Sequence, residues 1–310
     1  MKTYILSLTL CCCLCNSWLF AQSRQVAITI DDIPNVSLYQ EDGHESVMLA
    51  YLKENKIPAA IFVNESRIFQ NEHFRQNFDV YLKWFYSPLL TIGNHTYEHL
   101  NYADTTLEAF QADIMKGEAI SKPLLKAQNR ELDFFRFPFN SLGEDSLAHR
   151  QVMDFLAKQG YTLAPHSISS EDWMYNALYV HHLAAGQPEK ADSVGVAYVA
   201  QTLKLFDYYE QLTKELYDRP IKQIYLCHEN ALNRDYLPTL LDSLQKHEYK
   251  LISLKEALKD PAYAAEDHYF GRWGFSWLYR WMQDAEKRRE LLRAEPFDQR
   301  IYQAYQSLGK

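Results

Sequence analysis

The sequence predicts an α/β fold: a distorted barrel of about seven parallel strands, followed by a helical extension. From Gln25 onward, short β-rich runs alternate with helical stretches, and polar residues follow the ends of several of these runs. Such alternation is typical of βα units around a parallel sheet or barrel. With 310 residues, the chain has room for one large domain of this kind.

Seven β-rich runs are the predicted strands, and they cover residues 26–30, 59–63, 89–92, 134–137, 161–164, 221–227 and 250–253. The predicted helices between them cover residues 45–55, 71–84, 107–127, 145–159, 191–216 and 236–247. Thr105 and Glu108 have the spacing of a capping box, which predicts that the Thr105 hydroxyl accepts a hydrogen bond from the Glu108 amide. A helix is therefore expected to begin just after the segment from His95 to His99.

Two histidines, His95 and His99, follow one predicted strand, and two carboxylates, Asp31 and Asp32, end an earlier one. Imidazole suits zinc and similar metals, a carboxylate completes a His₂Asp set, and a catalytic site keeps one position open for water. Adjacent residues of a strand face opposite ways, so only a strand end or turn brings both aspartates to one site. One aspartate then holds the metal while the other takes a proton from water. The plainer alternative is a histidine pair on a helix or loop and an aspartate turn before Pro34.

Polar residues follow other predicted strands as well: Arg136 is at the fourth, Asp172 comes after the fifth and His228 after the sixth. Active sites of α/β barrels are built from the loops at the carboxyl ends of the strands. The sequence therefore predicts that these residues meet the aspartates and histidines at one site. For Arg136 and Asp172, an ion pair at the barrel mouth is the structural alternative.

Composition excludes some classes of partner. The net charge is -8 and no basic stretch is present, which argues against a nucleic-acid partner because phosphate binding needs clustered Lys and Arg. An acidic polymer is disfavoured as a substrate for the same reason. The aromatic content of 14% fits sugar stacking, although Tyr and Trp serve buried cores equally well.

Residues 1–21 are predicted to be a secretory signal. Lys2 supplies the positive region, residues 5–14 the apolar region, and Ala21 a cleavage edge before Gln22. Four of the five cysteines lie in this segment, so only Cys227 remains in the mature chain and no intramolecular disulfide forms. We expect a periplasmic or secreted protein, in preference to one lipid-anchored at an early cysteine. No later apolar run approaches the ~20 residues needed to span a bilayer.

The tail, residues 260–310, differs from the rest of the chain. It contains Pro261, an aromatic run over residues 269–281 and a charged stretch over residues 284–295. We expect a helical extension that packs its aromatic residues against the barrel, with an exposed docking surface as the alternative.

Five ordered motifs together resemble the polysaccharide deacetylase family, also called the NodB-homology or carbohydrate esterase family 4 proteins. They are Thr29 to Asp32, His95 to His99, Arg136 to Phe139, Asp172 with Trp173, and His228 preceded by Ile224, Tyr225 and Leu226. Each motif is short, but their order is specific. The resemblance spans residues 25–254 and implies a NodB-like catalytic domain over residues 22–259.

The resemblance also implies roles. Asp32, His95 and His99 would hold one divalent metal, with zinc expected and cobalt, manganese or nickel as alternatives. Asp31 would be the catalytic base, oriented by Arg136, and His228 the general acid, supported by Asp172. The Phe139 amide would bind the oxyanion, and Trp173 would either stack on a sugar face or wall the cleft. The implied reaction is hydrolysis of acetyl groups, N-acetyl in first place, on chitooligosaccharide, peptidoglycan or a related glycan, with O-acetylated acetylxylan as a further option.

Four positions depart from the family pattern. Ile33 stands in place of the usual Gly, Phe139 in place of Tyr, Ser169 in place of Asp, and Tyr225 in place of Leu. The Phe139 change removes a phenol but keeps the backbone N–H that an oxyanion hole needs. None of the changes removes a proposed ligand or proton carrier, so we expect an active enzyme.

Two rival functions remain open from the sequence. His95, Glu98 and His99 also fit the inverzincin pattern of zinc metallopeptidases, in which Glu98 would be the base and the pair would lie on a helix. Gly93 and Asn94 precede the pair and favour a loop. The other rival is a non-catalytic carbohydrate-binding protein on the same fold, which loss of Asp31 or His228 would have indicated.

Overall fold

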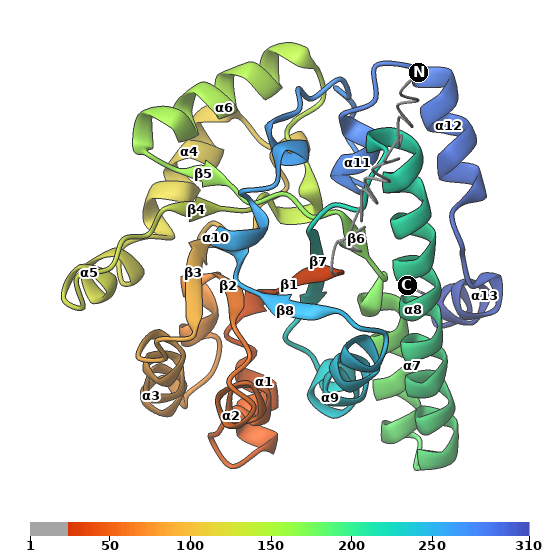
Figure 1. Ribbon diagram of the computed structural model, residues 1–310. Helices are drawn as coiled ribbons and strands as arrows, with labels where there is room; N and C mark the ends of the chain where they lie inside the picture. Colours follow the sequence, from red (N-terminus) through yellow and green to blue (C-terminus); the bar gives the residue numbers. More distant parts are fainter. Residues whose placement is uncertain (1–23, 310) are drawn as a thin grey trace, which may run out of the picture.

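A computed structural model describes residues 24–309, which form one curled sheet surrounded by helices (Figure 1). Seven strands follow one another in the order β5, β4, β3, β2, β1, β7, β6, and β8 pairs with β1. Every strand pair is parallel. The predicted distorted barrel of about seven parallel strands is therefore confirmed.

The strands match the predicted runs closely where they are long, and the short strand β6 was not predicted. Their bounds are β1 Gln25–Ile33, β2 Ala59–Val63, β3 Leu90–Asn94, β4 Phe134–Phe135, β5 Thr162–Leu163, β6 Ile168–Ser169, β7 Gln223–His228 and β8 Lys250–Ile252.

The helices up to residue 257 pack mainly around the sheet. Their bounds are α1 Val36–Glu41, α2 Val47–Glu54, α3 Phe74–Phe85, α4 Leu107–Lys116, α5 Ser121–Lys126, α6 Ser146–Gln159, α7 Asp172–Ala184, α8 Pro188–Tyr217, α9 Ala231–Lys246 and α10 Leu254–Ala257. Four 3₁₀ helices connect other elements: η1 Glu65–Phe69, η2 Tyr102–Asp104, η3 Pro138–Asn140 and η4 Pro261–Ala264.

Three helix predictions need correction. The predicted helix over residues 107–127 is two helices, α4 and α5, with a break between Lys116 and Ser121. Its cap is Thr106, whose side chain accepts from the Ala109 amide, and not Thr105. The helices α1 and α7 were not predicted. Asp172 begins α7 and follows β6, whereas the sequence analysis placed it after the fifth predicted strand.

The core is built on both faces of the sheet. On β1, Val26, Ile28 and Ile30 belong to the large cluster between sheet and helices, whereas Ala27 belongs to a smaller cluster on the opposite face. Because side chains alternate along a strand, Thr29 and Asp31 share the face of Ala27. Thr29 and Asp31 therefore lie on the same face of the sheet as the smaller apolar cluster.

The chain beyond Asp260 is largely helical, and its helices α12 and α13 lie beside α8 in Figure 1. It contains α11 Trp277–Arg280, α12 Ala285–Ala294 and α13 Gln299–Ser307. Trp277 and Tyr279 are buried, and α13 contacts α7. Many aromatic residues of this part thus pack inward, while Phe270, Trp273 and Phe297 stay exposed.

The predicted signal segment over residues 1–21, with its four cysteines, lies outside the described residues. Cys227 is buried and forms no disulfide within the described chain. Between residues 24 and 309, none of the helices is both long and apolar enough to cross a lipid bilayer.

Candidate active site

Asp31 and His228 are direct register partners on the neighbouring parallel strands β1 and β7. Both stand near the carboxyl ends of their strands, so they meet at the same edge of the sheet. Asp32 follows with a φ of 71°, and the β1–β2 register shifts between Ile30 and Ile33. This irregularity breaks the alternation of side chains along the strand and brings Asp32 to the same side as Asp31, as the sequence analysis predicted.

Hydrogen bonds hold the segment from His95 to His99 in a fixed loop after β3. The His95 amide donates to the Val63 carbonyl at 3.0 Å, and the Asn64 side chain donates to the carbonyls of His95 and Thr96. Gly117 approaches so closely that a Cβ there would lie 2.7 Å from the Thr96 carbonyl carbon. The loop is therefore clamped between β2 and the end of α4.

Six residues at this edge of the sheet have a positive φ without being glycine: Asp32, Thr96, His99, Phe139, Asn140 and Glu171. Such conformations cost about 1–3 kcal/mol each and persist where the surrounding structure enforces them, often at functional sites. Their clustering here marks the edge as a candidate site independently of the sequence motifs.

Asp32, His95 and His99 form a compact group of potential metal ligands. One ligand atom from each residue lies within 4.8 Å of the others. The His99 Nε2 atom is 3.3 Å from Asp32 Oδ1, and the His95 Nε2 atom is 3.8 Å from the same oxygen. The His95 Nδ1 atom lies 2.9 Å from the Arg136 carbonyl oxygen, which leaves Nε2 facing Asp32.

The electrostatics of the group fit a divalent metal. Burial lowers the pKa of both His95 and His99, so the imidazoles are neutral and able to ligate. Burial opposes ionisation of Asp32, but the nearby His99 and Arg67 hold its pKa well below the usual value. Asp32 Oδ1 is buried and accepts no hydrogen bond among the described residues, although Arg67 Nη2 lies 3.0 Å away. A His₂Asp donor set with a carboxylate oxygen left without a hydrogen-bond donor suits such an ion.

Asp31 is held by a buried arginine. The Arg136 Nη1 group donates to Asp31 Oδ1 at 2.9 Å and to Thr29 Oγ1 at 2.6 Å, and its Nε donates to the Ala164 carbonyl at 3.0 Å. Burial raises the pKa of Asp31 to about 6, although Arg136 opposes this shift. Asp31 is thus fixed in orientation and has the proton affinity of a base that works near neutral pH.

His228, which is half-buried, forms a pair with the buried Asp172. The His228 Nδ1 atom lies 2.7 Å from Asp172 Oδ1, while Asn230 and Asn233 donate to Asp172 Oδ2. Burial lowers the pKa of His228, but the Asp172 carboxylate outweighs it and raises the pKa to about 10. His228 is therefore protonated at neutral pH, with Asp172 locking the ring.

Phe139 stands beside the ligand group, and Trp173 stands apart from it. The Phe139 ring is 4.7 Å from the His99 ring, centroid to centroid, and 59% of the residue is exposed. The Trp173 indole donates to Glu171 and meets the Tyr305 ring edge-on. Within the described chain, the Trp173 side chain makes no hydrogen bond or ring contact with Asp31, Asp32 or the site histidines.

Glu98 does not occupy the position that a metallopeptidase base needs. Residues 95–99 are not helical, and the Glu98 carboxylate is exposed, with Lys116 Nζ 3.9 Å away. The Glu98 amide donates to Asp113. The helix that the inverzincin interpretation requires is therefore missing from this segment.

Sequence reasoning missed several residues that shape the site. Arg67, in η1, pairs with the Asp32 carboxylate and also donates to its carbonyl oxygen. Asn233 and Asn230 hold Asp172, and Tyr225, a departure from the family pattern, is linked through Tyr198 to Asn233. No local pattern marks Arg67, whereas Asn230 is recognisable as a helix cap just after His228.

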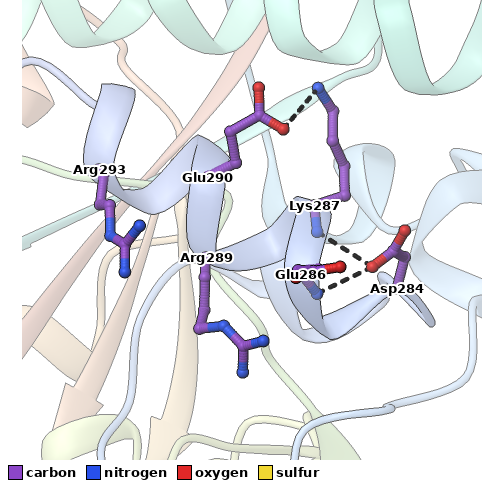
Figure 2. Close-up of a pocket in the computed structure, with 6 residues that line it drawn as sticks. All are labelled: Asp284, Glu286, Lys287, Arg289, Glu290 and Arg293. Atoms are coloured by element: carbon purple, nitrogen blue, oxygen red, sulfur yellow. Dashed lines mark hydrogen bonds and ion pairs between the residues drawn. The ribbon is translucent and has the colours of Figure 1, made fainter.

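A separate charged hollow lies on α12, and Figure 2 shows its lining residues: Asp284, Glu286, Lys287, Arg289, Glu290 and Arg293. The Asp284 carboxylate caps the helix by accepting from the amides of Glu286 and Lys287. Lys287 pairs with Glu290 at 3.5 Å, and the two arginines point away from that pair (Figure 2). The hollow holds none of the proposed site residues and has the character of a solvated helix surface.

Comparison with known protein families identifies the fold. Residues 21–164 match the family described as polysaccharide deacetylase. The chain carries a polysaccharide deacetylase domain. The matched segment includes Asp31, Asp32, His95, His99 and Arg136. No curated protein matches the chain significantly in sequence.

Solved structures similar to this deacetylase domain share little sequence with it. Peptidoglycan deacetylase PdaC from Bacillus subtilis is 16% identical, with 77% of this chain and 93% of that chain covered and a TM-score of 0.47. The polysaccharide deacetylase Bc1974 from Bacillus cereus is 14% identical, with 74% and 91% covered and a TM-score of 0.49. BA3943, a CE4 family pseudoenzyme from Bacillus anthracis, is 17% identical, with 77% and 66% covered and a TM-score of 0.46. The family assignment rests on the sequence match.

Proposed function

We propose that this protein is a metal-dependent deacetylase that hydrolyses N-acetyl groups of a glycan. The observation that carries the proposal is the meeting of a His₂Asp group, a buried base and a protonated histidine at one edge of the sheet. Chitooligosaccharide and peptidoglycan are the substrates proposed first. An O-acetylated glycan such as acetylxylan would use the same groups.

Asp32, His95 and His99 would hold one divalent metal, with zinc proposed before cobalt, manganese or nickel. When bound, the metal supplies Lewis acidity that polarises the acetyl carbonyl and lowers the pKa of the attacking water. The lowered pKa values of the three residues favour the neutral imidazoles and ionised carboxylate that binding requires.

Asp31 would act as the general base. Its Oδ2 atom lies 3.7 Å from His95 Nε2, so the carboxylate borders the ligand group while Oδ1 is engaged by Arg136. Arg136 orients the carboxylate and favours its ionised form, and Asp31 takes the proton of the attacking water. The Phe139 N–H would then donate a hydrogen bond to the developing oxyanion.

His228 would act as the general acid. It is protonated at neutral pH because Asp172 stabilises the imidazolium, and its Nδ1 is engaged by that carboxylate. The Nε2 proton is therefore the one that His228 gives to the departing sugar amine, which releases acetate and a free amine. Trp173 is proposed as a wall of the cleft near Asp172.

The test is release of acetate from a panel of glycans, measured with added zinc and with a chelator. The panel contains N-acetylchitotetraose, peptidoglycan fragments and acetylxylan oligosaccharides. Zinc-dependent acetate release from at least one glycan is expected. Failure to release acetate from any of them, by a protein shown to have bound metal, contradicts the proposal and favours a non-catalytic carbohydrate-binding protein.

We also propose that the chain is exported and cleaved after Ala21, leaving a catalytic domain over residues 22–259 and the C-terminal extension over residues 260–310. The proposal is supported by the charged and apolar character of residues 1–21. Mass spectrometry of the mature amino terminus tests it. An intact Met1 in a cytosolic fraction contradicts export, and a lipid on an early cysteine shows the anchored variant.

A further inference from the structure

We propose that Trp273, in the C-terminal extension, forms a stacking subsite for a sugar ring next to the acetylated sugar. The glycan-binding cleft would then include the extension, and an oligosaccharide would bind better than a single sugar. This inference rests on the proposed function, because the glycan reaches Trp273 only if its acetylated sugar lies beside His99 and Phe139.

The segment that carries Trp273 is docked on the turn that carries Phe139. Gly274 packs so tightly there that a Cβ would lie 2.3 Å from the Asn140 Cβ and 2.6 Å from the Phe139 carbonyl oxygen. The Asn140 side chain donates to the Phe275 carbonyl at 2.7 Å and accepts from the Trp277 indole at 3.0 Å. Trp273 is thus the direct chain neighbour of a residue that touches Phe139, whose ring in turn contacts His99.

Arg272 ties the same segment to two loops of the catalytic domain. Its guanidinium pairs with Glu144 at 2.7 Å and with Asp104. Asp104 ends the 3₁₀ helix η2 that follows the His95 to His99 loop, and Glu144 follows the Phe139 turn. The guanidinium carbon also lies 5.7 Å from the centre of the Trp273 ring, within cation–π distance. These contacts fix the backbone beside Trp273 on the rim of the proposed site.

Trp273 is nevertheless 70% exposed, more than any other large hydrophobic residue described. The neighbouring charges of Arg272, Asp104 and Glu144 are paired with one another, and the exposed indole offers an apolar surface beside them. A sugar ring fits this combination, because its flat face carries C–H groups and its edge carries hydroxyls. An indole suits such a partner, since it combines a large apolar face with a polar N–H.

The occupant proposed is the substrate glycan itself, because Gly274, the next residue after Trp273, packs on the Phe139 turn that borders the proposed site. A chain that places its acetylated sugar against His99 and Phe139 extends over the surface around them. The rim on this side is made by residues 272–274 and by the two loops that Arg272 joins. A monosaccharide would reach the reacting groups without reaching Trp273.

The test compares binding of N-acetylchitotetraose and N-acetylglucosamine, by calorimetry, in a zinc-loaded Asp31→Asn background, in which turnover is expected to be about 10²- to 10⁴-fold slower. Adding Trp273→Ala is expected to weaken binding of the tetrasaccharide by about 3- to 10-fold, the usual worth of one aromatic contact, and to leave the monosaccharide unchanged. Trp273→Tyr should restore most of the affinity. Phe297→Ala is the matched control, because Phe297 is an exposed aromatic residue of the same extension that packs on Tyr302.

Each outcome has a defined meaning. Equal affinity of the tetrasaccharide for the Trp273→Ala protein and its parent overturns the subsite and leaves the proposed function intact. Equal weakening by Phe297→Ala also overturns it, because the effect would then not be specific to Trp273. If the unsubstituted protein neither binds the tetrasaccharide nor deacetylates any glycan of the panel, the proposed function itself fails, and the subsite with it.

Discussion

Asp31 and His228 face each other across the β1–β7 pairing as register partners, yet each is held by a different buried charge, Arg136 for Asp31 and Asp172 for His228. The pKa values of the two groups therefore differ widely, although both lie at the same edge of the sheet. Burial raises the pKa of Asp31 to about 6, and Asp172 outweighs burial to raise the pKa of His228 to about 10. Between these values a carboxylate base and an imidazolium acid coexist, which is the state that amide hydrolysis needs.

The first prediction concerns this pair. Asp31→Asn and His228→Ala should each lower turnover by about 10²- to 10⁴-fold, because each removes one proton-transfer step. Both proteins should keep their metal, since neither residue completes the ligand group. Steady-state kinetics and metal analysis of the two variants measure this. Full turnover in either variant would show that the residue is not a proton carrier.

The second prediction concerns the metal. The chelated protein should lose acetate release and regain it with added zinc, and His95→Ala or His99→Ala should each lower metal content as well as activity. Removing one of three ligands leaves too few donors for a tight site. Metal analysis after dialysis measures the loss of bound metal. An unchanged circular dichroism spectrum shows that the loss does not come from a general folding defect. Full metal content in both histidine variants would refute the ligand assignment.

The third prediction concerns pH. His228 is active when protonated, so its raised pKa keeps activity high up to about pH 10. Asp172→Asn removes the opposing charge and should move the alkaline limit of turnover down by about 1–3 pH units. The pH profile of kcat for both proteins measures the shift. An unchanged alkaline limit would mean that another group sets it.

The same pair links stability to pH with a defined sign. Because the folded pKa of His228 exceeds its ordinary value of 6.5, the stabilisation by Asp172 is complete below that value and is lost as pH rises through about 10. The difference in unfolding free energy between the unsubstituted protein and Asp172→Asn should therefore narrow between pH 7 and pH 10.5. A difference that grows over this range would contradict the proposed ion pair.

The fourth prediction separates the two hydrolytic mechanisms. The Glu98 carboxylate is exposed and lies near Lys116, so Glu98→Gln should leave turnover within about 2-fold of the parent. The metallopeptidase mechanism predicts the reverse, with Glu98→Gln inactive and Asp31→Asn active. Acetate release and peptide cleavage by the two variants decide between them.

The long strands could be predicted from sequence because they are apolar runs buried on both faces, as in β2 and most of β1. The helix α7 could not, since α8 and α9 cover part of it and its exposed positions include Trp173, Val180 and Leu183, so it lacks a clear polar face. Two-residue strands such as β6 have too few residues to show any periodicity. The fold class was thus predictable from the elements whose burial produces a recognisable hydrophobic pattern in the sequence.

In the candidate site, the residues next to strand ends were predictable because parallel strands bring their carboxyl ends together. Arg67 was not, because its approach to Asp32 depends on how η1 packs, which no short pattern records. The same is true of Trp273, whose placement on the rim results from tertiary docking of Gly274 on the Phe139 turn. Local chemistry thus indicated the proposed reacting groups, whereas the residues that support them could be found only in the structure.

The fifth prediction tests one such support, Gly117. A Cβ at this position would lie 2.7 Å from the Thr96 carbonyl carbon and 2.8 Å from the Tyr97 nitrogen, both backbone atoms that cannot move without shifting the histidine loop. Gly117→Ala should therefore destabilise the fold by about 1–3 kcal/mol through overpacking and also weaken zinc affinity. Denaturant unfolding and competitive zinc titration measure the two effects.

Gly160→Ala is the matched control, because Gly160 has a φ of 81° and no heavy atom within 4 Å of a built Cβ. Its substitution strains the end of α6 and should lower stability while leaving zinc affinity unchanged. If Gly117→Ala lowers stability but binds zinc as tightly as the Gly160→Ala protein, the close approach of Gly117 is only a packing feature. Weaker zinc binding by Gly117→Ala alone shows that the end of α4 holds His95 and His99 at their working distance from Asp32.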